Sequence, residues 1–155
     1  MRVRIVALGQ RMPAWVRTGY DEYAKRMPRE YAFELLEIKP APRDRGKTVA
    51  QMLDAEAHSI RSACANDRVV ALDERGSAWT TRDLAAKLVR WRDDDASVAF
   101  VIGSADGLDE AFKRSANERV AVSAMTLPHG LVRIVMAEQL YRAASLIAGH
   151  PYHRE

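Results

Sequence analysis

The chain has 155 residues, of which 48% are hydrophobic and 29% charged, as in a single soluble globular domain. Its one cysteine, Cys64, excludes an intramolecular disulfide and a cysteine-rich metal site. The net charge is only +3, yet the first 50 residues carry eleven Lys and Arg against six Asp and Glu. This imbalance suits a basic face that meets an anionic partner, although scattered solvated charges explain it equally well.

Strand and helix patterns alternate along the whole chain. Short apolar runs predict strands over residues 3–8, 33–38, 68–73, 97–103 and 121–125. Helical composition predicts helices over residues 14–27, 48–65, 82–92, 108–116 and 131–148, with Thr81 as the N-cap of the third. This alternation predicts an α/β fold with a mostly parallel sheet flanked by helices. Because the chain opens directly into a strand pattern, we expect no signal peptide and a cytoplasmic location.

The expected helix over residues 131–148 is too apolar for a surface helix. Its few polar positions are Arg133, Glu138, Gln139, Arg142 and Ser145. A helix that is apolar most of the way round must be covered on more than one side. A sheet can cover one side, and a second subunit is the natural cover for the other. The interspersed charges argue against a membrane span.

Three expected strand ends offer places for a ligand: Leu72 and Asp73, residues 103–107, and residues 125–130. In open α/β sheets, ligands gather at the carboxyl ends of the strands. The Gly103-x-x-x-Gly107 turn lets the backbone approach a ligand closely. It is neither the dinucleotide fingerprint nor a P-loop, and a tight strand-to-helix turn explains it equally well.

No arrangement of residues points to a nucleophile or a metal. Cys64 falls in an expected helix without an obvious base beside it, and His58 fits an exposed helical position. His129, His150 and His153 lack the spacing of metal ligands, so we expect no metal. The position of His129 suggests a cap for the last helix.

Four stretches of the chain resemble one known family. They are Gly-Ser-Ala-Asp-Gly at 103–107, Ser-Ala-Met-Thr-Leu-Pro-His at 123–129 followed by Leu-Val-Arg, Glu-Gln-Leu-Tyr-Arg-Ala at 138–143, and Tyr-His-Arg-Glu at 152–155. Together they resemble the ribosomal large-subunit methyltransferase H family of SPOUT proteins, and the resemblance extends over the whole chain. It implies one SPOUT domain over residues 1–155, with a deep trefoil knot over about 97–150 and a functional tail at 150–155.

The resemblance also implies an activity. The methyl donor is expected to be S-adenosylmethionine, and the reaction N3-methylation of a pseudouridine in 23S rRNA on the assembled ribosome, by a homodimer without a metal or a membrane. Cofactor contacts are carried over to Leu72, Gly103, Val122, Ser123, Ala124, Met125, Thr126 and Leu127. This sequence departs from the family at Ser104, where a second glycine is frequent, and at Gly130, where Gln or Pro is common.

The same family suggests how the reaction is assisted. His153 is the candidate for handling the N3 proton, and Arg142 and Arg154 are candidates for orienting the base, contacting phosphate or stabilising charge. Glu138 is expected to orient Arg142, and Tyr152 to stack on a base. The tail of one subunit is expected to complete the site of its partner. For His153, an ordered dimer contact without chemistry is the alternative.

RNA positioning is assigned to the basic N-terminal third of the chain, with Arg11, Arg17, Lys25, Arg26, Arg43, Arg45 and Lys47 as candidates. Trp15 and Tyr20 are interpreted as core residues. Two other functions stay open: a SPOUT enzyme acting on tRNA or another rRNA nucleotide, and a non-catalytic protein that binds the ribosome. A Rossmann-type methyltransferase is disfavoured, because no glycine-rich loop follows the first strand.

Overall fold

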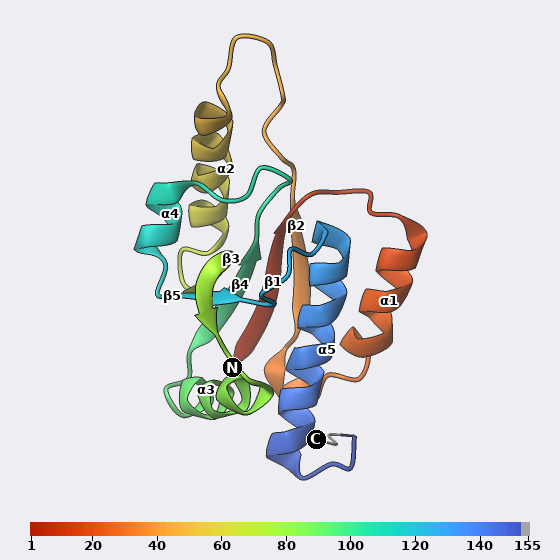
Figure 1. The fold of residues 1–155 in the computed structure, drawn as a ribbon. Helices are drawn as coiled ribbons and strands as arrows, with labels where there is room; N and C mark the ends of the chain where they lie inside the picture. The colour runs from red at the N-terminus through yellow and green to blue at the C-terminus, as the bar shows by residue number, and fades with distance from the viewer. Residues whose placement is uncertain (153–155) are drawn as a thin grey trace.

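Five parallel strands form one sheet in a computed structural model that describes residues 1–152. The strands are β1 (Arg2–Leu8), β2 (Glu34–Ile38), β3 (Arg68–Ala78), β4 (Ser97–Ile102) and β5 (Glu118–Ala121), in the spatial order β2-β1-β4-β3-β5. The helices are α1 (Ala14–Ala24), α2 (Val49–Ala63), α3 (Thr81–Asp93), α4 (Glu110–Ser115) and α5 (His129–Ala148), with a 3-10 turn η1 (Arg29–Tyr31). The predicted α/β fold with a parallel sheet flanked by helices is confirmed (Figure 1).

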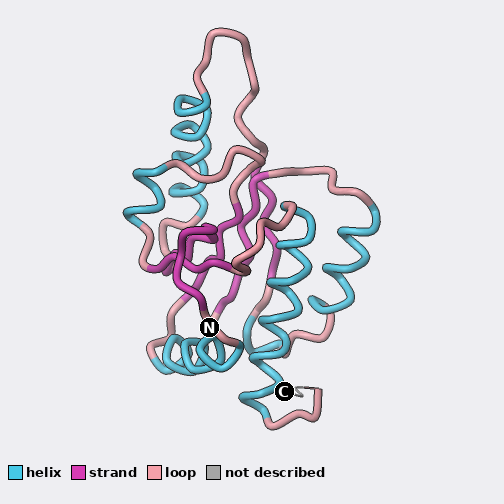
Figure 2. Tube along the Cα trace, in the orientation of Figure 1, coloured by secondary structure: helices cyan, strands magenta, loops and turns pink. Residues whose placement is uncertain are grey.

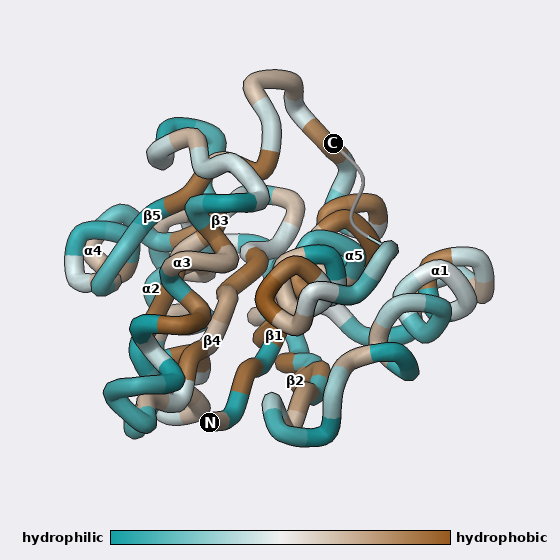
Figure 3. The backbone as a smooth tube through the Cα atoms, turned by 90° about the horizontal axis from the view of Figure 1, so that it is seen from below, coloured by the Kyte–Doolittle hydropathy of each residue, from teal (hydrophilic) through white to brown (hydrophobic). Residues whose placement is uncertain are grey.

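Helices cover both faces of the sheet. Successive strand residues point to opposite faces, so β1 sends Val3 and Ile5 to one side and Val6 and Leu8 to the other. The first side packs against α1, α3 and α5, and the second against α2 and α4. This double burial explains why the central strands read as continuous apolar runs. Hydrophobic residues colour much of β1, β4 and α5 in Figure 3.

The predicted strand over residues 121–125 is wrong in its position. Strand β5 pairs with β3 from Glu118 to Ala121, and the chain leaves the sheet at Val122. The apolar residues that suggested a strand therefore lie in an irregular segment, where they meet a cavity instead of a neighbouring strand. Strand β3 also runs past its predicted end to Ala78, with a register break between Leu72 and Ser77.

The predicted N-cap Thr81 is also wrong, because the cap is Thr80. The Thr80 hydroxyl accepts a hydrogen bond from the Asp83 N–H at 3.1 Å, and the Asp83 carboxylate accepts one from the Thr80 N–H at 2.8 Å. This reciprocal pair is a capping box, which satisfies two donors that the first helical turn would leave unpaired. Thr81 is the first residue of α3, and the acidic residue three places after Thr80 identifies Thr80 as the cap.

Helix α5 packs on the sheet and is crossed by α1. Met136, Ala137, Leu140 and Ala143 are buried in the core shared with α1 and α3. At Gly130 a Cβ atom would lie 2.8 Å from Val16 Cγ2, so glycine there permits the close approach of α1. No helix in the described part of the chain is long and apolar enough to cross a membrane.

Two loops frame the functional end of the sheet. The segment between β2 and α2 projects beyond the rest of the molecule (Figure 2). The segment between β5 and α5 crosses the carboxyl ends of the strands and delivers the chain to the first turn of α5. The knot expected over residues 97–150 stays a prediction.

Candidate active site

A cavity of about 460 Å³ lies where strands β3, β4 and β5 end and helix α5 begins. Its walls include Leu72 from β3, Gly103 after β4, and the segment that follows β5. Of the residues in that segment, Val122, Ser123, Met125, Thr126 and Leu127 line the cavity, whereas Ala124 is exposed and does not. The structure thus brings together seven of the eight positions predicted to contact a cofactor.

Apolar side chains and backbone groups dominate the cavity. Leu72, Val122, Leu127 and Val132 supply apolar surface for a flat aromatic ring or an aliphatic chain. The N–H groups of Thr126 and Leu127 donate to no other backbone group within residues 1–152. Unpaired backbone donors at the rim of an apolar cavity can read the polar edge of an adenine without any charged side chain.

Gly103 is required by the shape of the turn. A Cβ atom added to Gly103 would lie 2.5 Å from the Gly107 carbonyl oxygen, which is closer than Cβ atoms in folded proteins approach a non-bonded atom. The two glycines therefore bring the ends of the turn together at the mouth of the cavity. The Gly103-x-x-x-Gly107 pattern therefore reflects this close approach of two backbone segments. Because neither glycine has a side chain, the turn presents backbone atoms to the cavity.

His129 belongs to the cavity wall and does not cap the helix, as the sequence had suggested. The N-cap residue is Pro128, and the His129 imidazole reaches back to the turn after β4. Its Nδ1 lies 2.8 Å from the Gly103 carbonyl oxygen, and its Nε2 lies 2.9 Å from Arg133 Nε. Because an arginine Nε–H can only donate, Nε2 must accept and Nδ1 must carry the proton. Burial lowers the pKa of His129, which agrees with a neutral ring.

Arg133 holds four elements together behind the cavity. Its side chain is 1% exposed, and besides His129 it donates to the Gly9 carbonyl at 2.8 Å and to Glu37 Oε2 at 2.6 Å. These contacts join the ends of β1 and β2 to the first turn of α5, and through His129 to the end of β4. From the sequence, Arg133 was a polar position in the last helix and part of a family motif, with no role assigned to it. His129 and Arg133 are four residues apart, which places both on one helix face. This spacing could have predicted their contact from the sequence.

Two carboxylates line the cavity, of which the sequence had marked Asp73, at an expected strand end, but not Glu74. Asp73 and Glu74 line it from the excursion of β3 beyond Leu72. Asp73 is nearly buried and lies 3.5 Å from Lys113 Nζ and 3.8 Å from Arg119 Nη1. These two cations fix Asp73 as part of the wall.

A second polar cluster lies at the other end of α5 and contains three of the residues discussed for catalysis. Arg142 Nε donates to Glu138 Oε1 at 2.8 Å, and the Tyr152 hydroxyl donates to the same oxygen at 3.0 Å. The Arg142 guanidinium also lies 4.9 Å from the centre of the Tyr152 ring. The hydrogen bond to Glu138 raises the pKa of Arg142 above its ordinary value, and burial raises that of Tyr152. His153 and Arg154, the other catalytic candidates, lie outside the described residues.

Within one chain the two clusters do not meet. Arg142 follows His129 by 13 positions on the same helix, which corresponds to about 20 Å along its axis. Figure 1 shows the start of α5 near the strand ends and its last turn at the opposite end of the molecule. Within one chain, the predicted cofactor residues are therefore separated in space from Glu138 and Arg142.

The basic residues assigned to RNA positioning divide into two groups. Four have acidic partners within the chain: Lys25 and Arg26 with Glu22, Arg43 with Glu56 and Asp106, and Lys47 with Asp44. Three form no ion pair with any residue of the described chain, namely Arg11, Arg17 and Arg45. The second group retains its full charge for an anionic partner.

Other expectations from the sequence can be checked against burial. Tyr20 is buried in the core as predicted, but Trp15 is 56% exposed, so its interpretation as a core residue is wrong. Cys64 is buried, and burial raises the pKa of its thiol to about 11, which rules out a reactive thiolate near neutral pH. His58 lies at an exposed position on α2, as expected.

Known proteins resemble this chain over its full length. Residues 1–153 match the family model described as "Predicted SPOUT methyltransferase". A relative from Nitrosospira multiformis, named "Ribosomal RNA large subunit methyltransferase H", is 57% identical over 155 residues and covers 99% of each chain. A protein of the same name from Burkholderia thailandensis is 54% identical with the same coverage.

Solved structures share the architecture at much lower identity. A probable methyltransferase from Bordetella pertussis has a TM-score of 0.60 at 19% identity, covering 92% of this chain and 95% of that one. A tRNA (m1G37) methyltransferase from Aquifex aeolicus has a TM-score of 0.56 at 12% identity, covering 99% and 74%. These structures show the fold, and the relatives that match over the full length show the family. The chain belongs to the SPOUT methyltransferase family, among the ribosomal RNA large subunit methyltransferase H proteins.

Proposed function

We infer that this chain transfers a methyl group from S-adenosylmethionine to N3 of pseudouridine 1915 in 23S rRNA. The observation that carries the inference is the 57% identity, over 99% of both chains, to a protein named "Ribosomal RNA large subunit methyltransferase H". The cavity at the ends of β3, β4 and β5 adds a site of suitable size, since small-molecule pockets span about 300–1,000 Å³.

The residues at the cavity fit the cofactor of SPOUT methyltransferases. Leu72, Val122 and Leu127 offer apolar walls, and the unpaired N–H groups of the segment before α5 offer donors. Gly103 permits the close approach of the Gly107 carbonyl that shapes the turn at the cavity. S-adenosylmethionine supplies an activated methyl group on a sulfonium, so the protein has mainly to align that methyl with the attacking nitrogen.

The remaining chemical task is the proton on N3, which must leave before or during methyl transfer. We assign proton handling to His153 and stabilisation of the developing negative charge to Arg142 and Arg154. Glu138 holds Arg142 in place through a hydrogen bond of 2.8 Å, and Tyr152 packs against the same guanidinium. The raised pKa of Arg142 keeps it cationic, as this role requires.

A homodimer would unite the two separated clusters. A two-fold axis across α5 would place the Arg142 end of one helix beside the His129 end of the other. Exposed apolar side chains near the cavity support such an interface: Trp15 is 56% exposed, Leu131 38% and Met125 78%. We therefore propose a dimer with two composite active sites, each made of a cavity from one subunit and an α5 end and tail from its partner.

Mixing two inactive variants tests this composite site. Gly103→Val damages the cavity and Arg142→Met damages the other cluster, so each homodimer lacks activity. In a heterodimer one of the two sites has both defects and the other has none. Random subunit exchange should therefore restore about a quarter of wild-type activity. If each site were built within a single subunit, the mixture would stay as inactive as its components.

Methyl transfer from labelled S-adenosylmethionine tests the substrate. The acceptors are unmethylated whole ribosomes, isolated large subunits, naked 23S rRNA and tRNA, with the modified nucleotide mapped by mass spectrometry. We expect label at one pseudouridine, on whole ribosomes only, which would also place the enzyme in the cytoplasm with its substrate. Label on tRNA alone would replace the proposal by a tRNA methyltransferase, and cofactor binding without label on any acceptor would favour a non-catalytic ribosome-binding protein.

A further inference from the structure

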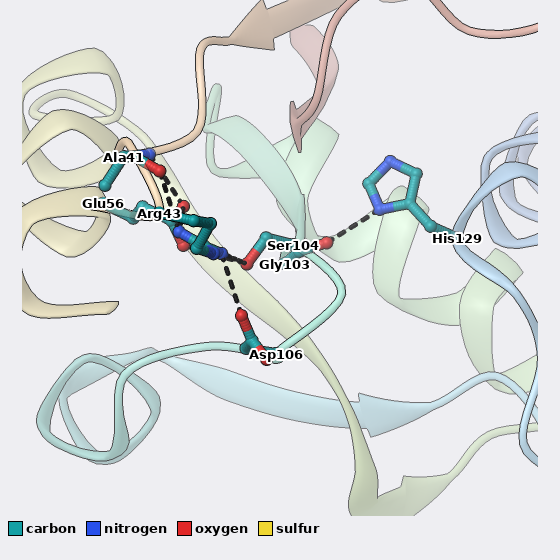
Figure 4. A network of polar contacts seen from close by, with 7 residues as sticks. All are labelled: Ala41, Arg43, Glu56, Gly103, Ser104, Asp106 and His129. Carbon is teal, nitrogen blue, oxygen red and sulfur yellow. Dashed lines mark hydrogen bonds and ion pairs between the residues drawn. The ribbon is translucent and has the colours of Figure 1, made fainter. Parts of the chain in front are cut away.

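Ser104 is the centre of a polar cluster beside the cavity. Its hydroxyl donates to Glu56 Oε1 at 2.9 Å and accepts from Arg43 Nη2 at 3.0 Å. The Arg43 guanidinium also lies 3.1 Å from Asp106 Oδ2, on the same turn as Ser104. Figure 4 shows Arg43 placed between the turn and Glu56, with His129 holding the Gly103 carbonyl from the other side. The 103–107 turn is thus held from two directions by side chains of distant elements.

Glu56 anchors this cluster on helix α2. The residue is 3% exposed, and its Oε2 accepts from the Ala41 N–H at 2.9 Å and from Arg43 Nη1 at 3.2 Å. With the Ser104 hydroxyl on its other oxygen, both carboxylate oxygens are engaged. A buried carboxylate destabilises the fold unless hydrogen-bond donors surround it. Because Glu56 takes its donors from both Ser104 and the chain near Ala41, the positions of these two segments depend on each other.

Beyond Arg43 the same segment carries charges that stay available. Residues 39–47 project from the molecule between β2 and α2, and Arg45 forms no ion pair with any residue in the described part of the chain. Lys47 pairs only with the exposed Asp44, at 3.9 Å. The base of the segment is therefore fixed to the cavity turn, and its tip presents positive charge to an anionic partner such as an RNA phosphate.

We propose that Arg43, Glu56 and Ser104 are positioning residues that couple the basic segment 39–47 to the cofactor-binding turn 103–107. Contact between RNA and the tip orders the segment, which keeps Arg43 on Ser104 and Asp106 and so holds the turn in its cofactor-binding shape. Because coupling between two sites is reciprocal, RNA contact tightens cofactor binding and bound cofactor tightens RNA binding. This inference rests on the proposed function, since it takes the cavity as the cofactor site and RNA as the partner.

Calorimetric titration of the free dimer with S-adenosylhomocysteine tests the contact with the turn. The Arg43 side chain is partly exposed, so its charge-assisted hydrogen bond contributes less than a buried one would, and we expect Arg43→Ala to weaken binding about fivefold. Arg45→Ala is the matched control: it removes the same charge two residues away, and its Kd should equal that of wild type. Equal Kd values for Arg43→Ala and Arg45→Ala would overturn the inference.

A double-mutant cycle identifies the route through Ser104. Ser104→Gly removes the hydroxyl that joins Arg43 to Glu56, and it should weaken cofactor binding about threefold. If Arg43 acts through that hydroxyl, the double variant Arg43→Ala/Ser104→Gly should bind more tightly than the product of the two single losses predicts. Strict additivity would contradict a shared route. Thermal unfolding shows whether each variant is folded. If one of them is unfolded, Glu56→Gln takes its place in the cycle, because glutamine keeps the shape of the glutamate side chain.

Cofactor binding in the presence of unmethylated ribosomes tests the coupling itself. Equilibrium dialysis with labelled S-adenosylhomocysteine should show tighter binding when ribosomes are present for wild type, and the same Kd with and without ribosomes for Arg43→Ala. An enhancement retained in Arg43→Ala would overturn the coupling. Failure of the proposed function would give a different result. In that case the wild-type protein would bind no S-adenosylhomocysteine, with or without ribosomes, and no variant would need to be compared.

Discussion

The two ends of helix α5 carry two arginines that do different work. Arg133 is 1% exposed and donates to Gly9 and Glu37, which lie 124 and 96 positions away, as well as to His129 on its own helix. Arg142 is 28% exposed and is held by Glu138, one helical turn earlier, and by Tyr152. The first arginine assembles a site and the second is presented by a helix that is already formed. Arg133, whose partners lie on distant elements, is expected to stabilise the fold. Arg142, whose partners are local, is expected to remain available for the reaction.

The largest effect should follow from Arg133→Met. The change leaves the Gly9 carbonyl, the His129 ring and Glu37 without their shared donor, in a place where the arginine was fully buried. Breaking a buried charged network usually costs 3–5 kcal/mol, and the partly exposed Glu37 places the expected loss at about 3 kcal/mol. Urea unfolding measures it, and cofactor binding should be lost as well. A loss below about 1 kcal/mol would show that the network is not structural.

Gly103→Val should remove activity while leaving the fold in place. The Cβ atom would displace the Gly107 carbonyl, which lies 2.5 Å from its position, and shift the cavity turn. A displacement of about 1 Å at a reacting site can lower kcat/KM about 100-fold. Gly107→Ala is the control on the same turn, because its Cβ meets nothing within 4 Å and carries only the strain of a φ of +86°. Similar losses in both variants would contradict the role assigned to the close approach.

Arg142→Met tests the other side of the comparison. Its ion pair with Glu138 is partly exposed and local, so the free energy of unfolding should fall by less than about 1 kcal/mol. Methyl transfer at saturating cofactor should fall about 10- to 100-fold, because the cation that stabilises the N3 anion is gone. The Kd for S-adenosylhomocysteine should not change. A weakened Kd with unchanged kcat would move Arg142 from the reaction to the cofactor.

The smallest effect is the pH dependence that His129 contributes to stability. Burial lowers the pKa of His129 in the folded protein below its ordinary value of about 6.5. The unfolded chain therefore takes up a proton first as the pH falls, so the stabilisation is complete above pH 6.5 and declines below it. Unfolding free energies measured between pH 7 and pH 5 should fall less steeply in His129→Asn than in wild type. Identical slopes would show that the pKa of His129 is the same in the folded and the unfolded protein.

The sequence predicted the parts of this molecule that depend on local pattern. Alternating apolar runs and helical segments were enough for the parallel α/β sheet, and the three strand ends marked the cavity before it was seen. The family resemblance supplied Leu72, Gly103 and the residues after β5, because those positions are fixed by motif. Their roles in binding stay predictions.

The sequence could not predict the contacts that depend on long-range approach. His129 looked like a cap because its partner, the Gly103 carbonyl, lies 26 positions away. Arg43 looked like a surface charge because its partner Ser104 is 61 positions away and comes close only when α2 and β4 are packed. Trp15 looked like core because aromatic residues usually are, whereas here it faces outward beside α5.

The hydrogen bond from Arg133 to the Gly9 carbonyl joins residues 124 positions apart, and it sets the order in which the protein can mature. Closing so long a loop is slow, and it cannot begin until the final helix has been synthesised. The cavity wall formed by His129 and Val132 is missing from any nascent chain that ends before α5. A growing chain therefore lacks the complete cavity, and we expect competence for methyl transfer only after α5 has left the ribosome that made it.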